Sequence, residues 1–334
     1  MPSQKQYRER KDNIASILRY IRAHGGSSRR QLCKELGLSW GCVSELVSIL
    51  LQQNILREED AVSTGTKGRS PAVLRLNPDI CFLGVDINLN GLRACVCNLL
   101  GEKTADYSGV LRLSNKDAFL SSVIGFAKEA VQKHPGISGI GFAIQGIFDP
   151  GRNEWEFPAQ KPFTVDLNQA FVGHFSVPIT IEHDPNCILY GCLEDDKASK
   201  MVLRLDSGIG AAVYTQSAFL RSGLLEVGHL VMDTQGRRLH EIVSLQAMKK
   251  HNADDAYFRE AGFYLGTALG NICNLLRLDE IYLCGDMISY YPRFEEAMLA
   301  QYSRVVLPTQ SARISAVEVT DAAYGAAKMA MDNF

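Results

Sequence analysis

Residues 28–51, with the sequence SRRQLCKELGLSWGCVSELVSILL, contain two helix starts on either side of a glycine turn. Ser28 and Gln31 form a capping box, which predicts a short helix that runs through Leu36. Gly37 then turns the chain, and Ser39 provides the N-cap of a longer helix. In this longer helix, apolar residues recur at helical spacing at Val43, Leu46, Val47, Leu50 and Leu51. The stretch therefore predicts a helix-turn-helix.

The flanking segments extend this motif into a winged module. Ile14, Ile17, Leu18 and Ile21 have the spacing of one helix face, which predicts a helix over residues 13–24. Residues 55–59 and 72–76 are typical of two short strands, and the polar residues 63–71 between them predict a wing. A module of this kind binds DNA with the outward side of its last helix. A plain three-helix bundle used for protein contacts is the alternative interpretation.

The residues that we expect to contact DNA lie on the last helix, near the first turn of the short helix, and in the wing. The outward side of the last helix would meet the major groove through Ser39, Trp40, Ser44 and Glu45. Phosphate contacts are expected from Arg29, Arg30 and Lys67. Gly68 permits close backbone approach, and Arg69 suits the negative potential of a narrow minor groove. A solvated loop arginine is the alternative for Arg69.

Composition and charge agree with a folded protein that touches nucleic acid at one end. The chain has 334 residues, of which 46% are hydrophobic and 22% charged, which argues against disorder. Residues 1–80 hold 13 Lys and Arg against 8 Asp and Glu, whereas the remainder holds 22 against 29. The polar start excludes a secretory signal, and no apolar run approaches the ~18 residues of a spanning helix. We therefore expect a cytoplasmic protein without a membrane partner.

The remainder of the chain alternates strands with helices, which predicts an α/β body. The clearest strands are expected at residues 82–86, 92–98, 137–144, 179–182, 201–205 and 281–284. Helices are expected near residues 116–134, 257–277 and 322–331.

Six short motifs, in order along the chain, resemble the ROK family, which contains bacterial sugar-responsive repressors and sugar kinases. They are the winged module with its Gly-Arg-Ser-Pro, Gly84 to Asp86, Gly146 to Asp149, Glu182 to Asn186, Ser207 to Gly210, and Glu226 to His229. The resemblance implies a two-lobed, actin-like ATPase (ribonuclease H-like) fold with a sugar site between the lobes. It implies a winged helix-turn-helix at residues 1–79, a first lobe at 80–187 and 318–334, and a second, oligomerising lobe at 188–317.

On the nucleotide side, the sequence departs from the kinases that it resembles. Their Asp-x-Gly-Gly-Thr turn is here Asp86-Ile87-Asn88-Leu89-Asn90, with side chains where phosphate would approach. Their Gly-Thr-Gly-x-Gly turn begins here with Asp206, a carboxylate where the first glycine would be, and a later glycine pair is Gly285-Asp286. These departures predict that ATP binding is lost and that the protein is not an enzyme.

On the sugar side, the family motifs are largely kept. Asp184 matches the catalytic Asp of the kinases, and without ATP it would only anchor a sugar hydroxyl. The resemblance also implies sugar contacts for Asp149, His183, Glu226, His229 and Glu241. The three cysteines of the family zinc site are missing, since only Gly236 to Ser244 remains of that segment. We therefore expect neither a metal nor another cofactor.

These observations predict a bacterial transcriptional regulator, with repression the expected mode, that binds operator DNA as a homodimer or higher homo-oligomer. A sugar or sugar derivative in the cleft between the lobes would control it. The alternatives are a sugar kinase with an appended DNA-binding domain, and a regulator that binds no sugar and answers to a partner protein.

Overall fold

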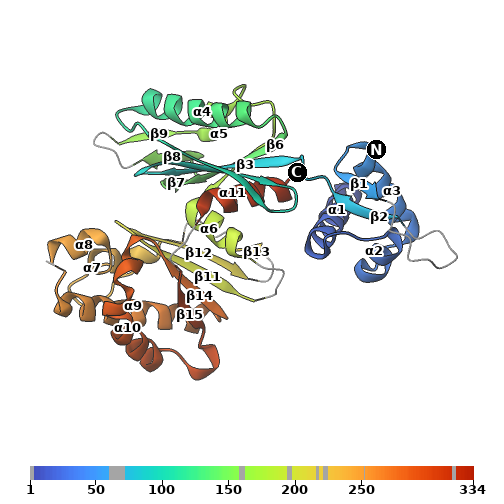
Figure 1. Cartoon of the computed structure of the whole chain (residues 1–334). Coiled ribbons are helices and arrows are strands. Elements are labelled where there is room, and N and C mark those ends of the chain that lie inside the picture. Colours follow the sequence, from blue (N-terminus) through green and yellow to red (C-terminus); the bar gives the residue numbers. More distant parts are fainter. Residues whose placement is uncertain are drawn as a thin grey trace.

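The computed structural model describes residues 4–59, 72–157, 162–193, 198–215, 218–220, 225–251, 253–317 and 321–334. A small head, formed by the N-terminal residues, lies beside a body of two stacked lobes (Figure 1). Within those ranges no helix has both the length and the apolar content to cross a bilayer.

The head consists of three helices and a two-stranded antiparallel sheet. Its elements are α1 (Gln4–His24), α2 (Arg29–Leu36), α3 (Trp40–Gln52), β1 (Leu56–Glu59) and β2 (Val73–Leu76). The side chains of Ser28 and Ser39 accept hydrogen bonds from Gln31 N and Cys42 N, as the sequence predicts. Gly37 ends α2 in the left-handed conformation (φ 66°), which glycine adopts without strain.

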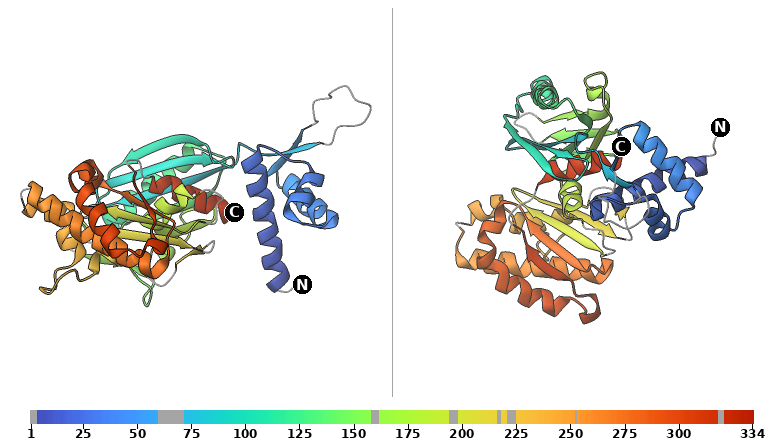
Figure 2. Two further views of the ribbon diagram at one scale, coloured as in Figure 1. Left: turned by 90° about the horizontal axis from the view of Figure 1, so that it is seen from below. Right: turned by 45° about the vertical axis from the view of Figure 1, so that its right-hand side comes forward.

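Helix α1 begins nine residues before the predicted start at residue 13. The prediction followed the apolar repeat, which begins at Ile14, whereas the preceding polar residues are good helix formers that need no buried face. The two head strands extend away from the helices (Figure 2). The segment that joins them, residues 60–71, lies outside the described residues, and with it Lys67, Gly68 and Arg69.

The first lobe is built on a five-stranded sheet in the order β10-β6-β3-β4-β5. Its strands are β3 (Cys81–Asn88), β4 (Gly91–Asn98), β5 (Lys103–Gly109), β6 (Ile137–Ile144) and β10 (Ile179–His183). Helix α4 (Lys116–Lys133) covers one face of this sheet and α11 (Ala322–Asp332) the other (Figure 1). A small sheet of β7 (Ile147–Asp149), β8 (Glu154–Phe157) and β9 (Phe163–Val165) precedes α5 (Leu167–Phe171).

The second lobe repeats this plan with the sheet order β13-β12-β11-β14-β15. Its strands are β11 (Lys200–Leu205), β12 (Ile209–Thr215), β13 (Ala218–Phe219), β14 (Glu280–Cys284) and β15 (Arg313–Ala316). In both lobes the first strand pairs antiparallel with the second and parallel with the strand after the long helix. This duplicated arrangement is the two-lobed actin-like fold that the family resemblance implies.

Helices cover one side of the second sheet. The long pair is α9 (Asp255–Leu276) and α10 (Tyr291–Val305), and the short elements are η1 (Val227–His229), α7 (Leu239–Ile242), α8 (Leu245–Lys250), η2 (Asp286–Tyr290) and η3 (Pro308–Gln310). Three glycines of α9, which are Gly262, Gly266 and Gly270, face α10 closely enough that a methyl group would overlap it. Helix α10 was not predicted from the sequence.

Helix α6 (Asp184–Cys192) and helix α11 lie between the two sheets and join the lobes. Their shared apolar layer takes Ala143 from the first sheet and Val202, Ala212 and Cys284 from the second. The helices touch backbone to backbone, because a Cβ atom on Gly325 would overlap the carbonyl oxygen of Cys187. On its other side, α11 meets the first sheet at Gly84 and Gly141 in the same way.

Replacing Gly325 by alanine should therefore destabilise the body. The added methyl group would force α11 away from α6, and overpacking of this kind costs about 3 kcal/mol in the free energy of unfolding. Urea denaturation of the full chain measures the change. The control is Gly125→Ala on α4, where nothing lies within 4 Å and a gain of about 1 kcal/mol is expected from helix propensity. Equal stability of Gly325→Ala and wild type would contradict the close contact.

Candidate functional site

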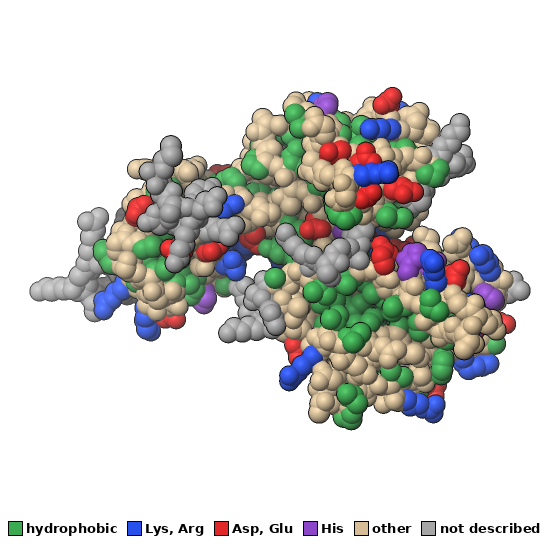
Figure 3. All heavy atoms as spheres, turned by 180° about the vertical axis from the view of Figure 1, so that it is seen from behind, with side chains coloured by type: hydrophobic (Ala, Val, Ile, Leu, Met, Phe, Trp, Pro, Cys, Tyr) green, Lys and Arg blue, Asp and Glu red, His purple; other side chains and the backbone are tan. Residues whose placement is uncertain are grey.

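A cavity of about 190 Å³ opens between the two lobes. The first lobe lines it with the β3–β4 turn, the residues after β6 and the start of α6, and the second lobe with the β11–β12 turn and the segment before η1. Its lining residues are Leu89, Gln145, Gly146, Ile147, His183, Asp184, Arg204, Asp206, Ser207, Gly208, Ile209, Gly210, Leu225 and Glu226. Acidic side chains lie along the junction of the lobes (Figure 3).

Strand ends place the polar groups of this cleft. Strand β10 ends at His183, and Asp184 begins α6 with Pro185 directly after it, a position that suits proline because its missing N–H is not needed there. Strand β11 ends at Leu205, and Asp206 then turns the chain into β12. Ligands of α/β proteins bind beyond the carboxyl ends of such strands. The cleft is therefore a candidate binding site for a small polar molecule.

An ion-paired arginine crosses the cleft. Nη1 of Arg204 donates to Asp184 Oδ2 at 2.5 Å, and its Nε donates to Asp206 Oδ2 at 2.5 Å. The second oxygen of Asp206 accepts from the backbone N–H of Asp286 at 2.6 Å. Only 4% of the Asp184 side chain and 13% of that of Arg204 are exposed. Because Asp184 belongs to the first lobe and Arg204 to the second, this pair joins the lobes.

The charges of this group shift one another's pKa values. Burial raises the pKa of Asp184, against the opposing effect of Arg204 and His183. Burial would lower the pKa of Arg204, but the carboxylates of Asp184, Asp206 and Asp86 outweigh it and raise that pKa. The guanidinium therefore stays charged, and its positive charge stabilises the ionised form of the buried carboxylates.

Asp86 lies close to this group and is the least satisfied polar residue of the region. Its side-chain Oδ1 is buried with no hydrogen-bond partner among the described residues. Burial raises the pKa of Asp86 to about 7, with Arg204 opposing the shift and Asp184 adding to it. The carboxyl group consequently gains or loses its proton near neutral pH.

The structure brings three of the six predicted sugar contacts into the cavity lining, namely His183, Asp184 and Glu226. Nε2 of His183 lies 3.6 Å from Asp184 Oδ1, and about half of the Glu226 side chain is exposed.

The other three predicted contacts lie outside that lining. Asp149 Oδ1 accepts from the backbone N–H of Gly151, which fixes its own turn. Glu241 Oε2 accepts from the N–H of Arg238 as part of the cap of α7. His229 is exposed, with its Nδ1 2.8 Å from Arg238 Nη1.

Two polar cavity residues, Arg204 and Gln145, were not predicted from the sequence. Arg204 is a cation that follows the apolar residues Met201 to Leu203 within a strand, which is a signal that could have marked it. Gln145 follows β6, and its side-chain oxygen accepts from the N–H of Leu89, which holds the β3–β4 turn against the cleft. The neighbouring residues Ile144 and Gly146 form no sequence pattern that predicts this contact.

The head presents the predicted DNA-contacting residues on one side of α3, with Trp40 60% exposed. Opposite it, Val43, Leu46, Val47 and Leu50 are buried. Ser39 caps α3, Ser44 is half-buried, and the exposed Glu45 pairs with Arg10 at 3.4 Å. Arg30 is exposed, whereas Arg29 pairs with Glu58 at 2.5 Å. Arg29 therefore has an acidic partner within the head.

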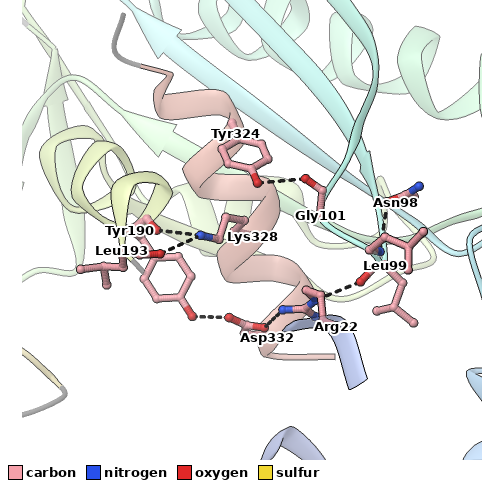
Figure 4. Close-up of polar contacts among 10 residues, drawn as sticks. Arg22, Asn98, Leu99, Gly101, Tyr190, Leu193, Tyr324, Lys328 and Asp332 are labelled. Atoms are coloured by element: carbon pink, nitrogen blue, oxygen red, sulfur yellow. Dashed lines mark hydrogen bonds and ion pairs between the residues drawn. The ribbon is translucent and has the colours of Figure 1, made fainter. Parts of the chain in front are cut away.

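The head is docked on the body through α1 and the end of the chain. Nε of Arg22 donates to the carbonyl of Leu99 at 3.0 Å, and its Nη1 lies 3.2 Å from Asp332 Oδ1 (Figure 4). The hydroxyl of Tyr190, on α6, donates to the other oxygen of Asp332 at 2.5 Å. The apolar core of the head continues into Leu99, Ala327 and Met331 of the body. Figure 2 shows the C-terminus beside α1.

This joint connects the head to the same two helices that border the cleft. Helix α6 begins at Asp184 in the cavity and reaches Tyr190 at the joint. Lys328 of α11 donates to the carbonyls of Tyr190 and Leu193, each at 3.3 Å, which fixes the end of α6 on α11 (Figure 4). A shift of α6 in the cleft would therefore reach Arg22 through Asp332.

Among the described residues, no group of three or more His, Cys, Asp or Glu is placed to hold a metal ion. His229 and His240 lie with ring centroids 4.8 Å apart, and Nδ1 of His240 contacts the carbonyl of Gly228 at 2.7 Å.

Comparison with known proteins agrees with this architecture. The ROK family model matches residues 82–240. The xylose repressor of Bacillus spizizenii is 25% identical over 341 residues, which covers 90% of this chain and 88% of that protein. A solved ROK-family transcriptional regulator, a homologue of the E. coli Mlc protein, covers 97% of this chain and 96% of its own, with a TM-score of 0.83 and 17% identity. The ROK hexokinase of Thermus thermophilus covers 75% of this chain and 98% of its own, with a TM-score of 0.65 and 17% identity. The predicted family resemblance is confirmed.

Asp86→Asn should change how stability depends on pH. The pKa of the folded carboxyl is raised to about 7 from the ordinary aspartate value of 3.8, so between these pH values the folded state keeps a proton that the unfolded state has lost. Stability therefore falls as the pH rises through this window, by up to about 4 kcal/mol from this group. Urea denaturation between pH 4 and 8 should show that the free energy of unfolding of Asp86→Asn increases relative to that of wild type as the pH rises through the window. The exposed control Asp106→Asn should run parallel to wild type, and parallel curves for Asp86→Asn would contradict the shift.

Arg22→Ala should loosen the head without unfolding it. The change removes two contacts to the body and leaves Asp332 without its cation, at a cost of about 2 kcal/mol. Hydrogen exchange should show α1 and β4 exchanging faster at the joint while α9 stays protected. Arg19→Ala, an exposed arginine on the same helix, is the matched control. Unchanged exchange at the joint in Arg22→Ala would mean that apolar packing alone docks the head.

Proposed function

We propose that this protein is a sugar-responsive transcriptional repressor, because the ROK family model matches residues 82–240 and a helix-turn-helix head precedes them. The head binds operator DNA, and a sugar or sugar derivative in the interlobe cleft controls that binding. The observation that carries the proposal is the presence of both parts in one chain, joined through α6 and α11.

The head supports the DNA-binding part of the proposal. Its apolar stripe is buried against α1 and α2, which leaves Trp40 and the neighbouring polar residues on the free side of α3. A recognition helix needs such an exposed side to reach base edges in the major groove. Arg30 is exposed at the start of α2, where it suits a phosphate contact. The wing residues Lys67, Gly68 and Arg69 remain predicted contacts.

The cleft supports the sugar-binding part. Asp184 and Glu226 are acceptors for hydroxyl hydrogens, and neutral His183 can donate or accept. Leu89, Ile147 and Leu225 supply apolar surface beside them, which is the mixture that a sugar ring with its alternating C–H and O–H groups requires. The roles of Asp149, His229 and Glu241 stay predictions, because these residues lie outside the cavity lining.

The contacts of the cleft favour a receptor over a kinase. The Leu89 side chain and the Asp206 carboxylate stand in the two turns where the related kinases place glycines for phosphate. A triphosphate would meet Asp206 and Asp184 in a partly buried site, where repulsion between like charges is strong. Asp184 is also held by Arg204, which disfavours its use as a general base.

The head–body joint gives the proposal a route for control. A sugar that moves α6 or changes the approach of the lobes would shift Asp332 and the head with it. By linkage, DNA and sugar then weaken each other's binding by the same factor. As a homodimer in the cytoplasm, the protein would present two heads to a two-fold operator, and a change in their separation would release it.

Two variants with opposite effects test the function. An operator fragment is first selected from random duplexes with the full chain, and its affinity is then measured with and without a panel of neutral sugars. Glu226→Gln should keep operator affinity and lose release by sugar, because it removes an acceptor in the cleft only. Arg30→Ala should keep the sugar response and lower the salt dependence of DNA binding by about one ion. Consumption of ATP with any of these sugars, abolished by Asp184→Asn, would overturn the proposal in favour of a kinase.

A further inference from the structure

Arg204 stands out because its charge is fully engaged inside the cleft. Arg204 belongs to β11, the central strand of the second sheet, where it lies opposite Gly210 of β12 on one side and Cys284 of β14 on the other. The rest of this strand is apolar except for Lys200 at its start, so burying Arg204 needs a compensating reason. Its side chain reaches the cavity, where it lies among the lining residues.

The partners of Arg204 are two carboxylates of different lobes. Asp184 and Asp206 each accept one of its N–H groups at 2.5 Å, and Asp206 is held in turn by the N–H of Asp286. The carboxylate of Asp184 therefore keeps a fixed direction across the cleft. One of its oxygens faces Arg204, and the other faces His183 at 3.6 Å.

The charge of the cavity wall remains negative in spite of the arginine. The wall carries the carboxylates of Asp184, Asp206 and Glu226 against the single guanidinium of Arg204. Asp86 adds a further carboxyl group nearby. A ligand with a phosphate group would therefore meet net repulsion, whereas an uncharged polyol would meet only hydrogen-bond acceptors and donors.

We propose that the pairing of Arg204 with Asp184 and Asp206 determines the specificity of the cleft: Arg204 holds Asp184 as an acceptor for an uncharged sugar, and because its charge is already balanced by these two carboxylates, the acidic wall rejects the phosphorylated form of that sugar. The inference rests on the proposed function, because it takes the cleft to be the effector site. It adds the class of effector, which is a neutral sugar.

Replacing Asp206 and replacing Arg204 should change the ligand specificity of the cleft in different ways. In Asp206→Asn the amide can still accept from Asp286, but the charge is gone, so part of the Arg204 charge becomes available to an anion. In Arg204→Gln the Asp184 carboxylate loses its cation in a buried site and takes up a proton, so it becomes a hydroxyl donor and a weaker acceptor for a sugar. The selectivity between a sugar and its phosphate ester separates these effects from a loss of stability.

The experiment is calorimetric titration of the full chain with D-xylose, D-glucose, glucose 6-phosphate, xylose 5-phosphate and inorganic phosphate. Wild type should bind a neutral sugar and not its ester. Asp206→Asn should gain at least about 10-fold in affinity for inorganic phosphate, and at least about 10-fold in the ratio of ester affinity to neutral-sugar affinity. Arg204→Gln should lose about 10-fold or more for the neutral sugar. The control is Asp233→Asn, an aspartate paired with Arg237 at 2.6 Å in the same lobe outside the cavity lining, which should match wild type.

Two results would overturn the inference. One is wild type binding an ester as tightly as the neutral sugar, and the other is Asp206→Asn gaining nothing for ester or phosphate, whether or not a sugar binds. If no neutral sugar binds but Asp206→Asn gains phosphate affinity, the proposed effector site fails, while the charge balance set by Arg204 stands. If Arg204→Gln does not fold, the Asp206→Asn comparison still decides.

Discussion

The close packing of α11 is the constraint on which the rest of the molecule depends. Gly84, Gly141 and Gly325 have no side chains, so α11 touches the first sheet on one side and α6 on the other, backbone against backbone. A helix held this closely has few alternative positions, because interiors are packed too densely to deform gradually. The geometry of the cleft and of the head joint follows from this packing. Helix α6 begins at Asp184 in the cleft, and α11 ends at Asp332, which pairs with Arg22.

This arrangement explains how one chain can link two distant sites. The lobes are joined by a small apolar layer and by the buried Arg204–Asp184 pair, whereas the head is joined by Arg22 and an apolar contact. Both joints use α6 and α11, so under the proposed function a ligand that favoured one lobe arrangement would also favour one head position. Coupling between sites requires such an element with two arrangements, each favoured by a different ligand.

The cleft also illustrates how a fold shared with kinases can serve recognition. Structures of ROK kinases match the fold of this chain, and in the cavity of this chain Arg204 pairs with the carboxylates of Asp184 and Asp206. Arg204 satisfies two buried carboxylates, and Asp206 takes up the N–H of Asp286. Buried charges are retained in proteins when they are paired, and removing one partner leaves the other at a high cost. Function therefore follows from the site and not from the fold.

The sequence alone determined the elements whose signals are local. Caps at Ser28 and Ser39, the glycine turn at Gly37 and the apolar repeats fix the head helices, and short motifs in order indicated the actin-like body. Only the tertiary structure decided which polar residues share the cleft. It separated Asp149 and Glu241, which fix their own turns, from Asp184 and Glu226, and it brought in Arg204 from a strand that reads as apolar core. The reason is physical: a cap or turn depends on neighbours within four residues, whereas a cleft depends on how two sheets meet across α6 and α11, and no local pattern encodes that approach.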